Sequence, residues 1–304
     1  MIGVPMSRQQ TLNIFLLCLL IVVVPVSASA ARIVAIGDLH GDLGATRQAL
    51  RLAGAIDDSD HWVGGDLILV QTGDQLDRGD QEQAILELLD RLQDEAKAAG
   101  GMVHLLNGNH ELMNARPDLR YVTEGGFADF QDAVVITEED SLLLAYEPDQ
   151  RARVAAFRPG SHYAQMLAER PVILVIDGNV FVHGGVLPMH LDYGIERLNR
   201  EVSEWLMGQG EAPDFIHTSK SPTWTRNYSD EADSNDCRQL EEVLERMGAS
   251  RMIVGHTVQE DGITPVCEDR VWCIDSGIAD YYGRRIEVLE IDGDQVRVLR
   301  APKQ

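Results

Sequence analysis

The sequence is poor in positive charge, in aromatic residues and in long apolar runs. Lys and Arg total 26 against 49 Asp and Glu, so the formal net charge is −23. Such a field repels nucleic-acid phosphates and anionic membrane surfaces, so we expect no nucleic-acid partner. The 304 residues are 44% hydrophobic, 25% charged and only 6% aromatic. This ordinary globular composition excludes a disordered, collagen-like or multi-spanning membrane chain.

The longest apolar run lies near the N-terminus and is too short to span a membrane. It covers residues 14–24, whereas a helix needs about twenty residues to cross a bilayer. Arg8 precedes this run, and Ala28 and Ala30 follow it with the A-x-A spacing of a signal-peptidase site. The pattern predicts a signal peptide over residues 1–30, a periplasmic or secreted protein, and no stable membrane insertion after cleavage. An uncleaved membrane anchor is the alternative.

Cysteine is also scarce, with four residues in the whole chain. Cys18 lies inside the expected leader, which leaves Cys237, Cys267 and Cys273 in the mature protein. An oxidising compartment permits one disulfide and one free thiol. Cys267 and Cys273 flank a short turn and would face each other across a hairpin, while Cys237 is an equally good partner. Three buried, reduced thiols are the remaining alternative.

After residue 31, short β-branched runs alternate with longer segments of helical spacing. This alternation predicts βαβ units and a mainly parallel sheet. Helical spacing covers residues 45–53 and 81–99, and a Gly-Gly pair at 100–101 should end the second helix. The strands expected in this part of the chain are residues 32–36, 67–71, 102–106, 172–176, 180–182 and 252–254.

Beyond residue 262 the pattern changes to consecutive strands. These cover residues 262–267, 271–274, 285–291 and 295–299, and we interpret them as a second, largely antiparallel sheet. Residues 114–170 are rich in helix formers and, apart from a short strand at 133–136, predict a helical insertion that forms one wall of a cleft. Residues 31–304 are therefore expected to form one α/β domain, a mixed parallel/antiparallel two-sheet β sandwich flanked by helices.

Polar side chains gather where the expected strands end. In chain order these residues are Asp38, His40, Asp74, Asp77, Arg78, Asn109, His110, His183 and His256. Ligands bind at the carboxyl ends of strands in open α/β sheets, so we expect these side chains to converge. Buried carboxylates in such number repel one another unless cations balance them. His, carboxylate and amide ligands without cysteine suit Mn²⁺, Fe or Zn²⁺.

The same segments resemble the five motifs of the calcineurin-like metallophosphoesterases, in their phosphoprotein phosphatase branch. They read G-D-x-H-G at 37–41, G-D-x-x-D-R-G at 73–79, G-N-H-E at 108–111, H-G-G at 183–185 and G-H at 255–256. Residues 106–114, 182–186 and 253–257 resemble the Shewanella-like (Shelph) group in particular. The resemblance implies a metallophosphoesterase-type fold and a metal-dependent hydrolase that acts on a phosphorylated protein or a small phosphomonoester.

The resemblance also implies a role for each motif residue. Asp38 and His40 would bind one divalent metal ion, Asp74 would bridge two ions, and Asn109, His183 and His256 would complete the second site. Mn²⁺ is the favoured metal for both. His110 would be the general acid, oriented by Asp77, and the phosphate would be held by Arg78 and Arg226. For Arg226, which lies in a short Pro-Thr-Trp-Thr-Arg segment, a surface salt bridge is the alternative.

In this interpretation a metal-bridging hydroxide attacks phosphorus directly, without a covalent phospho-enzyme. The Shelph group resembles tyrosine-type enzymes in preference, and a phenoxide leaves more readily than a serine alkoxide, so we expect a phosphotyrosine-preferring protein phosphatase. A dinucleoside-polyphosphate hydrolase, which shares the first and third motifs, is one alternative, and a non-catalytic metal-dependent binding module is another. The sequence assigns no role to Tyr281 or Tyr282 and no oligomeric state.

Overall fold

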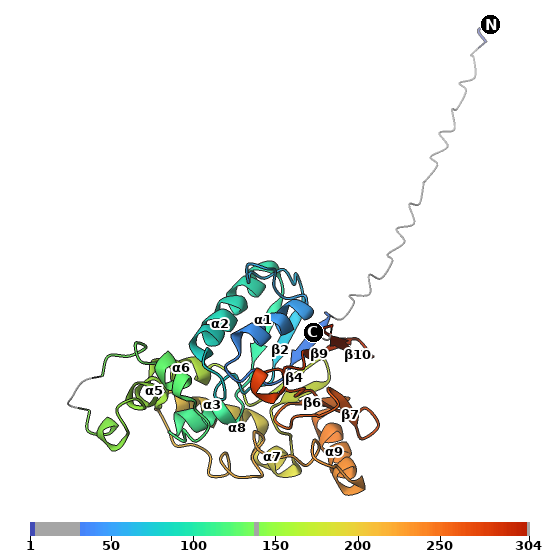
Figure 1. The fold of residues 1–304 in the computed structure, drawn as a ribbon. Coiled ribbons are helices and arrows are strands. Elements are labelled where there is room, and N and C mark those ends of the chain that lie inside the picture. The colour runs from blue at the N-terminus through green and yellow to red at the C-terminus, as the bar shows by residue number, and fades with distance from the viewer. Residues whose placement is uncertain (4–30, 137–139, 303–304) are drawn as a thin grey trace.

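The computed structural model describes residues 1–3, 31–136 and 140–302 (Figure 1). Nearly all of the expected signal peptide therefore lies outside the described residues. The helices are α1 (Leu43–Leu52), α2 (Glu82–Ala99), α3 (Asn109–Ala115), α4 (Glu124–Asp129), α5 (Arg151–Phe157), α6 (His162–Ala168), α7 (Pro188–Tyr193), α8 (Ile195–Leu206) and α9 (Ser234–Met247), with 3₁₀ turns η1 (Leu143–Ala145) and η2 (Asp280–Tyr282). Within the described ranges, none of these helices has the length and apolar composition that a membrane crossing requires.

The strands form two five-stranded sheets. They are β1 (Ile33–Ile36), β2 (Ile68–Gln71), β3 (Met102–Leu105), β4 (Ile173–Ile176), β5 (Asn179–Val182), β6 (Arg251–Val254), β7 (Thr264–Val266), β8 (Val271–Cys273), β9 (Glu287–Asp292) and β10 (Gln295–Arg300). The first sheet has the order β10-β9-β1-β2-β3, with β1, β2 and β3 parallel. The second has the order β4-β5-β6-β8-β7, with β5, β6 and β8 parallel. The expected mixed two-sheet architecture is confirmed.

The inner faces of the two sheets pack against each other. One buried cluster combines Ile33 and Leu289 of the first sheet with Phe181 and Ile253 of the second. All four residues of β1 are buried, which explains why this strand is a continuous apolar run instead of an alternating one. Each buried Val, Leu, Ile or Phe side chain of this layer contributes about 1.5–3 kcal/mol through its burial. The sandwich is therefore held together mainly by the apolar layer between its sheets.

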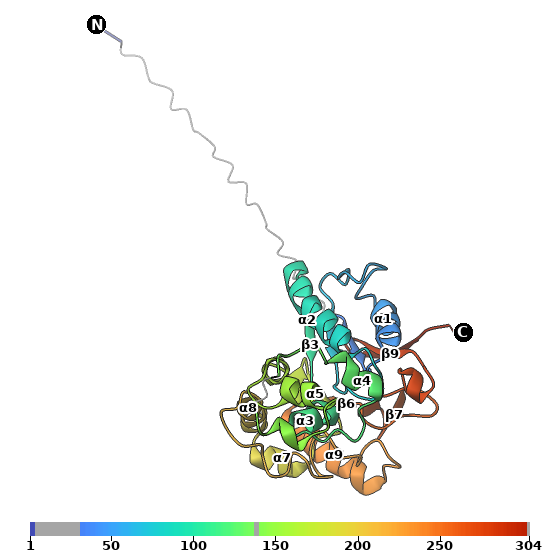
Figure 2. The same ribbon diagram turned by 60° about the vertical axis from the view of Figure 1, so that its left-hand side comes forward.

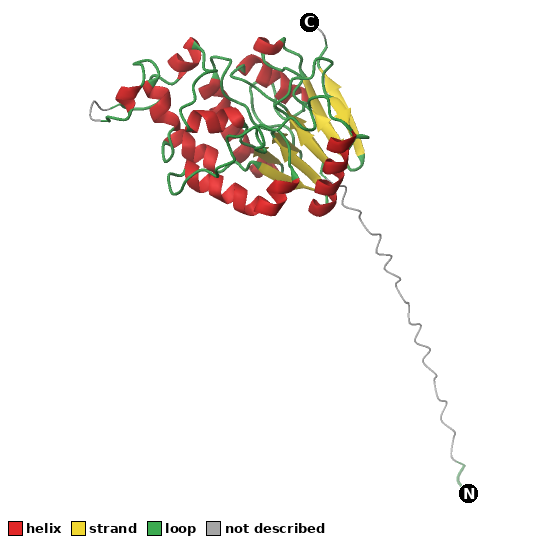
Figure 3. Ribbon diagram, turned by 90° about the horizontal axis from the view of Figure 1, so that it is seen from below, coloured by secondary structure: helices red, strands yellow, loops and turns green. Residues whose placement is uncertain are grey.

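Helices cover the outer faces of the sandwich (Figure 3). Leu50 of α1 and Leu89 of α2 share a buried cluster with Leu69 of β2. α8 and α9 instead belong to the cluster of the second sheet, and Figures 1 and 2 show them on the opposite side of the strands from α1 and α2. α2 ends as expected, because Gly100 adopts a left-handed φ of 90° and its N–H bonds the last turn of the helix.

The expected grouping of the C-terminal strands is wrong. β7 and β8 complete the second sheet, whereas β9 and β10 extend the first sheet along the free edge of β1. The register places Ile33 opposite Ile291, so the apolar residues of β9 cover the same core as those of β1. A local pattern identifies a strand but not the sheet edge on which it pairs. The buried strand β1 pairs with β2 on one side and with β9 on the other, which satisfies its backbone hydrogen bonds. The second sheet is consequently mixed instead of largely antiparallel.

In the described part of residues 114–170, α4, η1, α5 and α6 alternate with loops, and the strand expected at residues 133–136 is absent. Residues 131–133 form a turn in which the Ala133 N–H bonds the Phe130 carbonyl (3.1 Å). Val134 then packs against Leu143 and Val154. In the described part of the chain no strand pairs with this segment, and Val135 and Ile136 are exposed while Val134 covers helical residues.

Among the three cysteines that the structure describes, Cys237 and Cys267 form a disulfide and Cys273 is a buried free thiol. The hairpin alternative is wrong because Thr264, not Cys267, stands opposite Cys273 in the β7–β8 ladder. Cys267 lies beyond the ladder in the turn, where it reaches α9. The two bonded cysteines are 30 residues apart in the sequence. Closing a loop of that size stabilises a fold by about 3–4 kcal/mol.

Candidate active site

The loops that follow five strands meet at one place. The His40 N–H bonds the Asp74 carbonyl (3.0 Å), which joins the loops after β1 and β2. His183, after β5, reaches the β2 loop through the Thr72 carbonyl (3.0 Å) and lies 3.0 Å from Asn109 after β3. The His256 N–H, after β6, donates to Asp38 (3.2 Å), so the structure brings together all six expected metal ligands, namely Asp38, His40, Asp74, Asn109, His183 and His256.

Two glycines allow the β2 and β3 loops to touch. A Cβ on Gly73 would collide with the backbone of Gly108, and a Cβ on Gly108 would collide with the Asp74 carboxylate. Gly73 also has a φ of 103°, which side chains rarely permit. A larger residue at either position would therefore displace Asp74.

Several residues of the site adopt a left-handed backbone although they are not glycine. Their φ angles are 45° at His40, 56° at Asp74, 66° at Asp77, 69° at Arg78 and 67° at His256. Such conformations cost about 1–3 kcal/mol each and persist only where the surrounding structure holds them. Their concentration at these strand ends marks the region as a functional site.

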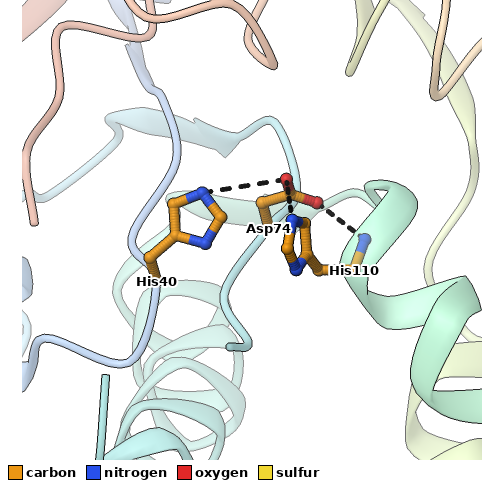
Figure 4. A group of neighbouring side chains, drawn as sticks. All are labelled: His40, Asp74 and His110. Carbon is orange, nitrogen blue, oxygen red and sulfur yellow. Dashed lines mark hydrogen bonds and ion pairs between the residues drawn. The ribbon is translucent and has the colours of Figure 1, made fainter. Parts of the chain in front are cut away.

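Asp74 is the centre of this arrangement (Figure 4). Its Oδ2 lies 3.1 Å from Nε2 of His183, 3.7 Å from Nε2 of His110 and 3.9 Å from Nε2 of His40. Two possible metal-binding groups share this carboxylate: one combines it with His40 and His110, and the other with His183 and His256. Within each group the donor atoms lie within 4.8 Å of one another.

The hydrogen bonds of His183 show that a cation fits here. A carbonyl can only accept, so Nδ1 of His183 donates to Thr72, and in the neutral form of the ring Nε2 carries a lone pair. That lone pair faces Oδ2 of Asp74 at 3.1 Å and Oδ1 of Asn109 at 3.0 Å. Three acceptors that converge without a proton between them repel one another, and a divalent cation between them removes the repulsion.

His40 and His256 also present unprotonated nitrogens. Nδ1 of His40 donates to the Leu76 carbonyl (3.0 Å), which leaves Nε2 free to bind a metal. Nε2 of His256 is buried and has no hydrogen-bond partner among the described residues. Burial lowers the pKa of His40 to about 4 and that of His256 well below its ordinary value. Both rings are therefore neutral, which is the form that binds metals.

Asp38 adds a further carboxylate that calls for a cation. Its Oδ2 lies 3.7 Å from Nε2 of His40, and the residue is only 2% exposed. Burial, together with the nearby Asp275 and Asp74, raises the pKa of Asp38 well above its ordinary value. Burial likewise raises the pKa of Asp275 to about 6. Bound divalent ions would allow these carboxylates to stay ionised.

His110 is held differently from the other histidines. Its Nδ1 hydrogen-bonds Oδ2 of Asp77 at 2.6 Å, and both side chains are buried. Burial lowers the pKa of His110, but Asp74 and Asp77 outweigh burial and raise the pKa to about 9. The ring can therefore keep one proton on Nδ1 and carry a second on Nε2, which faces the cluster. A general acid needs this arrangement.

Arg78 lies between two tyrosine rings at the mouth of the site. Its guanidinium carbon is 4.0 Å from the Tyr121 ring centroid and 4.8 Å from that of Tyr281, and Nη1 donates to the Tyr281 hydroxyl (3.1 Å). The Tyr282 ring centroid lies 5.2 Å from that of His40. Arg78, Tyr281 and His40 line a cavity of about 800 Å³, and Arg78 forms no ion pair with a carboxylate of the described chain.

Arg226 lies near the other side of the cluster. Its side chain is exposed, and its charge, after burial and His183, helps to lower the pKa of His256. The preceding Trp224 packs edge-on against His256 with 5.6 Å between ring centroids. No carboxylate of the described residues pairs with Arg226, so the salt-bridge alternative has no support in this part of the structure.

Residues 31–260 match the model of one protein family, the calcineurin-like phosphoesterases. This chain belongs to that family. It is 41% identical to Shewanella-like protein phosphatase 2 of Arabidopsis thaliana over 88% of this chain and 77% of the relative. Shewanella-like protein phosphatase 1 of Plasmodium berghei is 27% identical, over 88% of this chain and 74% of the relative.

Solved structures extend the similarity to three dimensions. The cold-active protein-tyrosine phosphatase of a psychrophilic Shewanella superposes with a TM-score of 0.70 and 25% identity, covering 89% of this phosphoesterase and 81% of that chain. The similarity confirms both the fold and the expected Shewanella-like grouping. This calcineurin-like phosphoesterase is accordingly a metal-dependent phosphoester hydrolase, and the binding-module alternative is set aside.

Several residues that shape the site of this phosphoesterase received no role in the sequence analysis, although Glu111 is part of the G-N-H-E motif. Glu111 accepts the N–H groups of Asp74 (2.8 Å) and Gly108 (2.7 Å), and so ties the β2 loop to the β3 loop. Its position in the first turn of α3, directly after the motif histidine, was an available signal. Tyr121 and Arg153 come from the insertion, and no local pattern connects them with the strand-end motifs.

Proposed function

We propose that this protein is a phosphatase that uses two divalent metal ions to hydrolyse phosphate monoesters, with phosphotyrosine in proteins as its preferred substrate. The observation that carries the proposal is the position of Asp74. One of its oxygens faces imidazole nitrogens from three separate strand ends at 3.1–3.9 Å, and the carboxylate belongs to both possible metal-binding groups. A shared carboxylate of this kind is what a two-metal site requires.

Each expected ligand has a place in this arrangement. One ion would be held by Asp38 and His40, the other by Asn109, His183 and His256, and both by Asp74. Mixed nitrogen and oxygen ligands suit Mn²⁺, Fe and Zn²⁺, and of these we propose Mn²⁺. Such ions supply an activated water nucleophile and positive charge for the phosphate oxygens when they are bound.

The chain's own residues account for proton transfer. As the bond between phosphorus and the leaving oxygen breaks, its electron pair stays on that oxygen, which takes the Nε2 proton of His110. The imidazole becomes neutral while its Nδ1 proton stays with Asp77. Water provides the fourth oxygen of the released phosphate. No side chain forms a bond to phosphorus in this scheme.

The two arginines are suited to binding the phosphate. Arg78 is restrained by Tyr121 and Tyr281 and has no carboxylate partner in the described chain, so its guanidinium is free to form paired hydrogen bonds with phosphate oxygens. We assign the same task to Arg226 on the opposite side. These two charges counter the overall negative field at the point where the substrate must bind.

We expect phosphotyrosine peptides to be hydrolysed with a kcat/KM at least about tenfold above that of matched phosphoserine or phosphothreonine peptides, a difference of about 1.4 kcal/mol. A phenoxide leaving group depends less on proton donation from His110 than an alkoxide does. Tyr281 also lines the cavity with an aromatic ring. The similarity to the Shewanella protein-tyrosine phosphatase supports this choice. Steady-state kinetics on peptides with identical neutral flanks measure the ratio.

The same assay separates the remaining substrate classes. A preference for phosphoserine would contradict the proposed preference for phosphotyrosine but not the proposed phosphatase activity. Faster turnover of a dinucleoside polyphosphate than of any monoester would favour the alternative hydrolase. Peptides with acidic flanks serve as a further control, because Asp42, Asp80 and Glu124 line the cavity. Their rates should improve as salt screens this repulsion.

We also propose that residues 1–30 form a signal peptide and that the mature catalytic domain, residues 31–304, acts in the periplasm or outside the cell. The disulfide between Cys237 and Cys267 supports an oxidising compartment. N-terminal sequencing of the protein from its native source should begin at Ala31. Recovery of Met1, or of the protein from the cytoplasm alone, would refute this assignment.

A further inference from the structure

A buried ion cluster connects the helical insertion to the loop after β2. Its centre is Arg153 on α5, whose side chain is 0% exposed. Nη2 donates to Oδ1 of Asp77 (3.0 Å), and Nε donates to Oδ1 of Asn114 (2.7 Å). Nη1 donates to the Gly126 carbonyl (3.0 Å) and lies 2.5 Å from Oε2 of Glu82. All three nitrogens of the guanidinium group therefore have partners.

Aromatic rings restrict the same guanidinium group. Its central carbon lies 5.0 Å from the Phe130 ring centroid and 5.3 Å from the Phe157 ring centroid. Contacts of this kind attract a cation to the ring faces. Because Arg153 is also fully buried, its side chain has no alternative position in solvent. It can act as a rigid anchor for whatever it contacts.

The anchored group is the carboxylate of Asp77. Oδ1 accepts hydrogen bonds from Arg153 and from Asn114 (3.0 Å each), while Oδ2 bonds Nδ1 of His110 at 2.6 Å. Turning Oδ2 away from His110 would break both bonds at Oδ1. Glu82 fixes the main chain as well, because it accepts the Asp77 N–H at 2.8 Å.

We propose that Arg153 is a positioning residue for proton transfer: it fixes Asp77 so that His110 directs its Nε2 proton toward the leaving oxygen. The inference rests on the general-acid role proposed above for His110. It gives the insertion a part in the reaction, since α5 lies within residues 114–170 and supplies the only arginine among the described residues that forms an ion pair with Asp77. The insertion is then more than a wall of the cleft.

The test is the dependence of kcat on the leaving group. We would measure kcat for a series of aryl phosphates from p-nitrophenyl phosphate to phenyl phosphate. The enzymes compared are the wild type, Arg153→Gln, Arg153→Lys and His110→Asn. A poor leaving group needs the proton and a good one does not. We expect Arg153→Gln to lower kcat about 10–100-fold for phenyl phosphate and only a few-fold for p-nitrophenyl phosphate. KM and bound metal should stay near wild-type values, and Arg153→Lys should recover part of the loss.

Two controls separate positioning from general destabilisation. Val154→Ala alters the neighbouring residue on α5, which is 4% exposed and packs against Leu143, away from Asp77. It should leave the leaving-group dependence unchanged. In an Asp77→Asn background, Arg153→Gln should add no further change, because the two residues act through one contact. If Arg153→Gln does not fold, the same comparison is made with Arg153→Lys.

The outcomes distinguish this inference from the proposed function. Steeper leaving-group dependence in His110→Asn together with unchanged dependence in the Arg153 variants would overturn the positioning role and leave the general acid in place. Unchanged dependence in His110→Asn would overturn both. An equal loss of kcat for all leaving groups in the Arg153 variants, or additive losses with Asp77→Asn, would show that Arg153 is merely structural.

Discussion

Asp74→Asn should abolish phosphatase activity, with a loss of more than about 10³-fold, because the charge that the two proposed metal ions would share is worth several kcal/mol of transition-state stabilisation. The replacement is nearly isosteric. The amide oxygen can still accept the main-chain N–H of His110, as Oδ1 of Asp74 does at 3.0 Å. The amide nitrogen takes the place of Oδ2 and turns donors toward His183, where a metal ligand is needed. Metal analysis should find fewer than two ions per chain.

A matched control separates the local effect from the loss of one negative charge. Asp192→Asn removes the same charge from a side chain that is 71% exposed and pairs only with Arg246 in the described structure. It should keep full activity and both ions. Two tightly bound ions and normal turnover in Asp74→Asn would contradict the assignment of the metal site.

His110→Asn should retain its metal ions and lose about 10²–10⁴-fold in kcat, the range expected for a general acid. The bond between His110 and Asp74 is formed by the main-chain N–H, so the substitution does not disturb it. Asp77 also keeps Asn114 and Arg153 as partners. The loss should be greatest for phosphate esters with poor leaving groups. Kinetics across leaving groups and metal analysis on one preparation test both statements.

This variant also decides between two interpretations of the His110 ring. Its Nε2 lies close enough to Asp74 and His40 to form a possible metal-binding group with them. If His110 were a ligand, His110→Asn would lose metal and its activity loss would not depend on the leaving group. His162→Asn, at the exposed start of α6, is the matched control and should behave as the wild type.

The strands were predictable because each is a short, buried apolar run with a turn signal at its end. β1 and α2 match their expected positions within one residue, and Gly100 ends α2 through its left-handed conformation. The pairing of β9 was not predictable. A strand pattern indicates which side chains are buried. Because the two sheets share one apolar layer, a strand can bury the same side chains at more than one sheet edge. Chain geometry decides among them.

The candidate site was likewise predictable only in part. Motifs at strand ends named Asp74, His110 and Arg78, because polar groups on strand-end loops with tight glycine turns leave a local signature. The residues that hold these groups in position left no such signature in the sequence. Arg153 and Tyr121 come from an insertion whose sequence has no fixed spacing from the motifs, so nothing local connects them with Asp77 or Arg78.

The sequence by itself determined the kinds of chemistry available: carboxylates, imidazoles and an amide at the ends of apolar strands, within an acidic chain that must gather cations locally. Only the tertiary structure decided how these groups face one another. Nε2 of His183 meets Asp74 and Asn109 at 3.0–3.1 Å because loops from two different sheets converge there. Arg153 reaches Asp77 from 76 residues away. Distances of this kind depend on packing between segments far apart in the chain, and no pattern within one segment contains them.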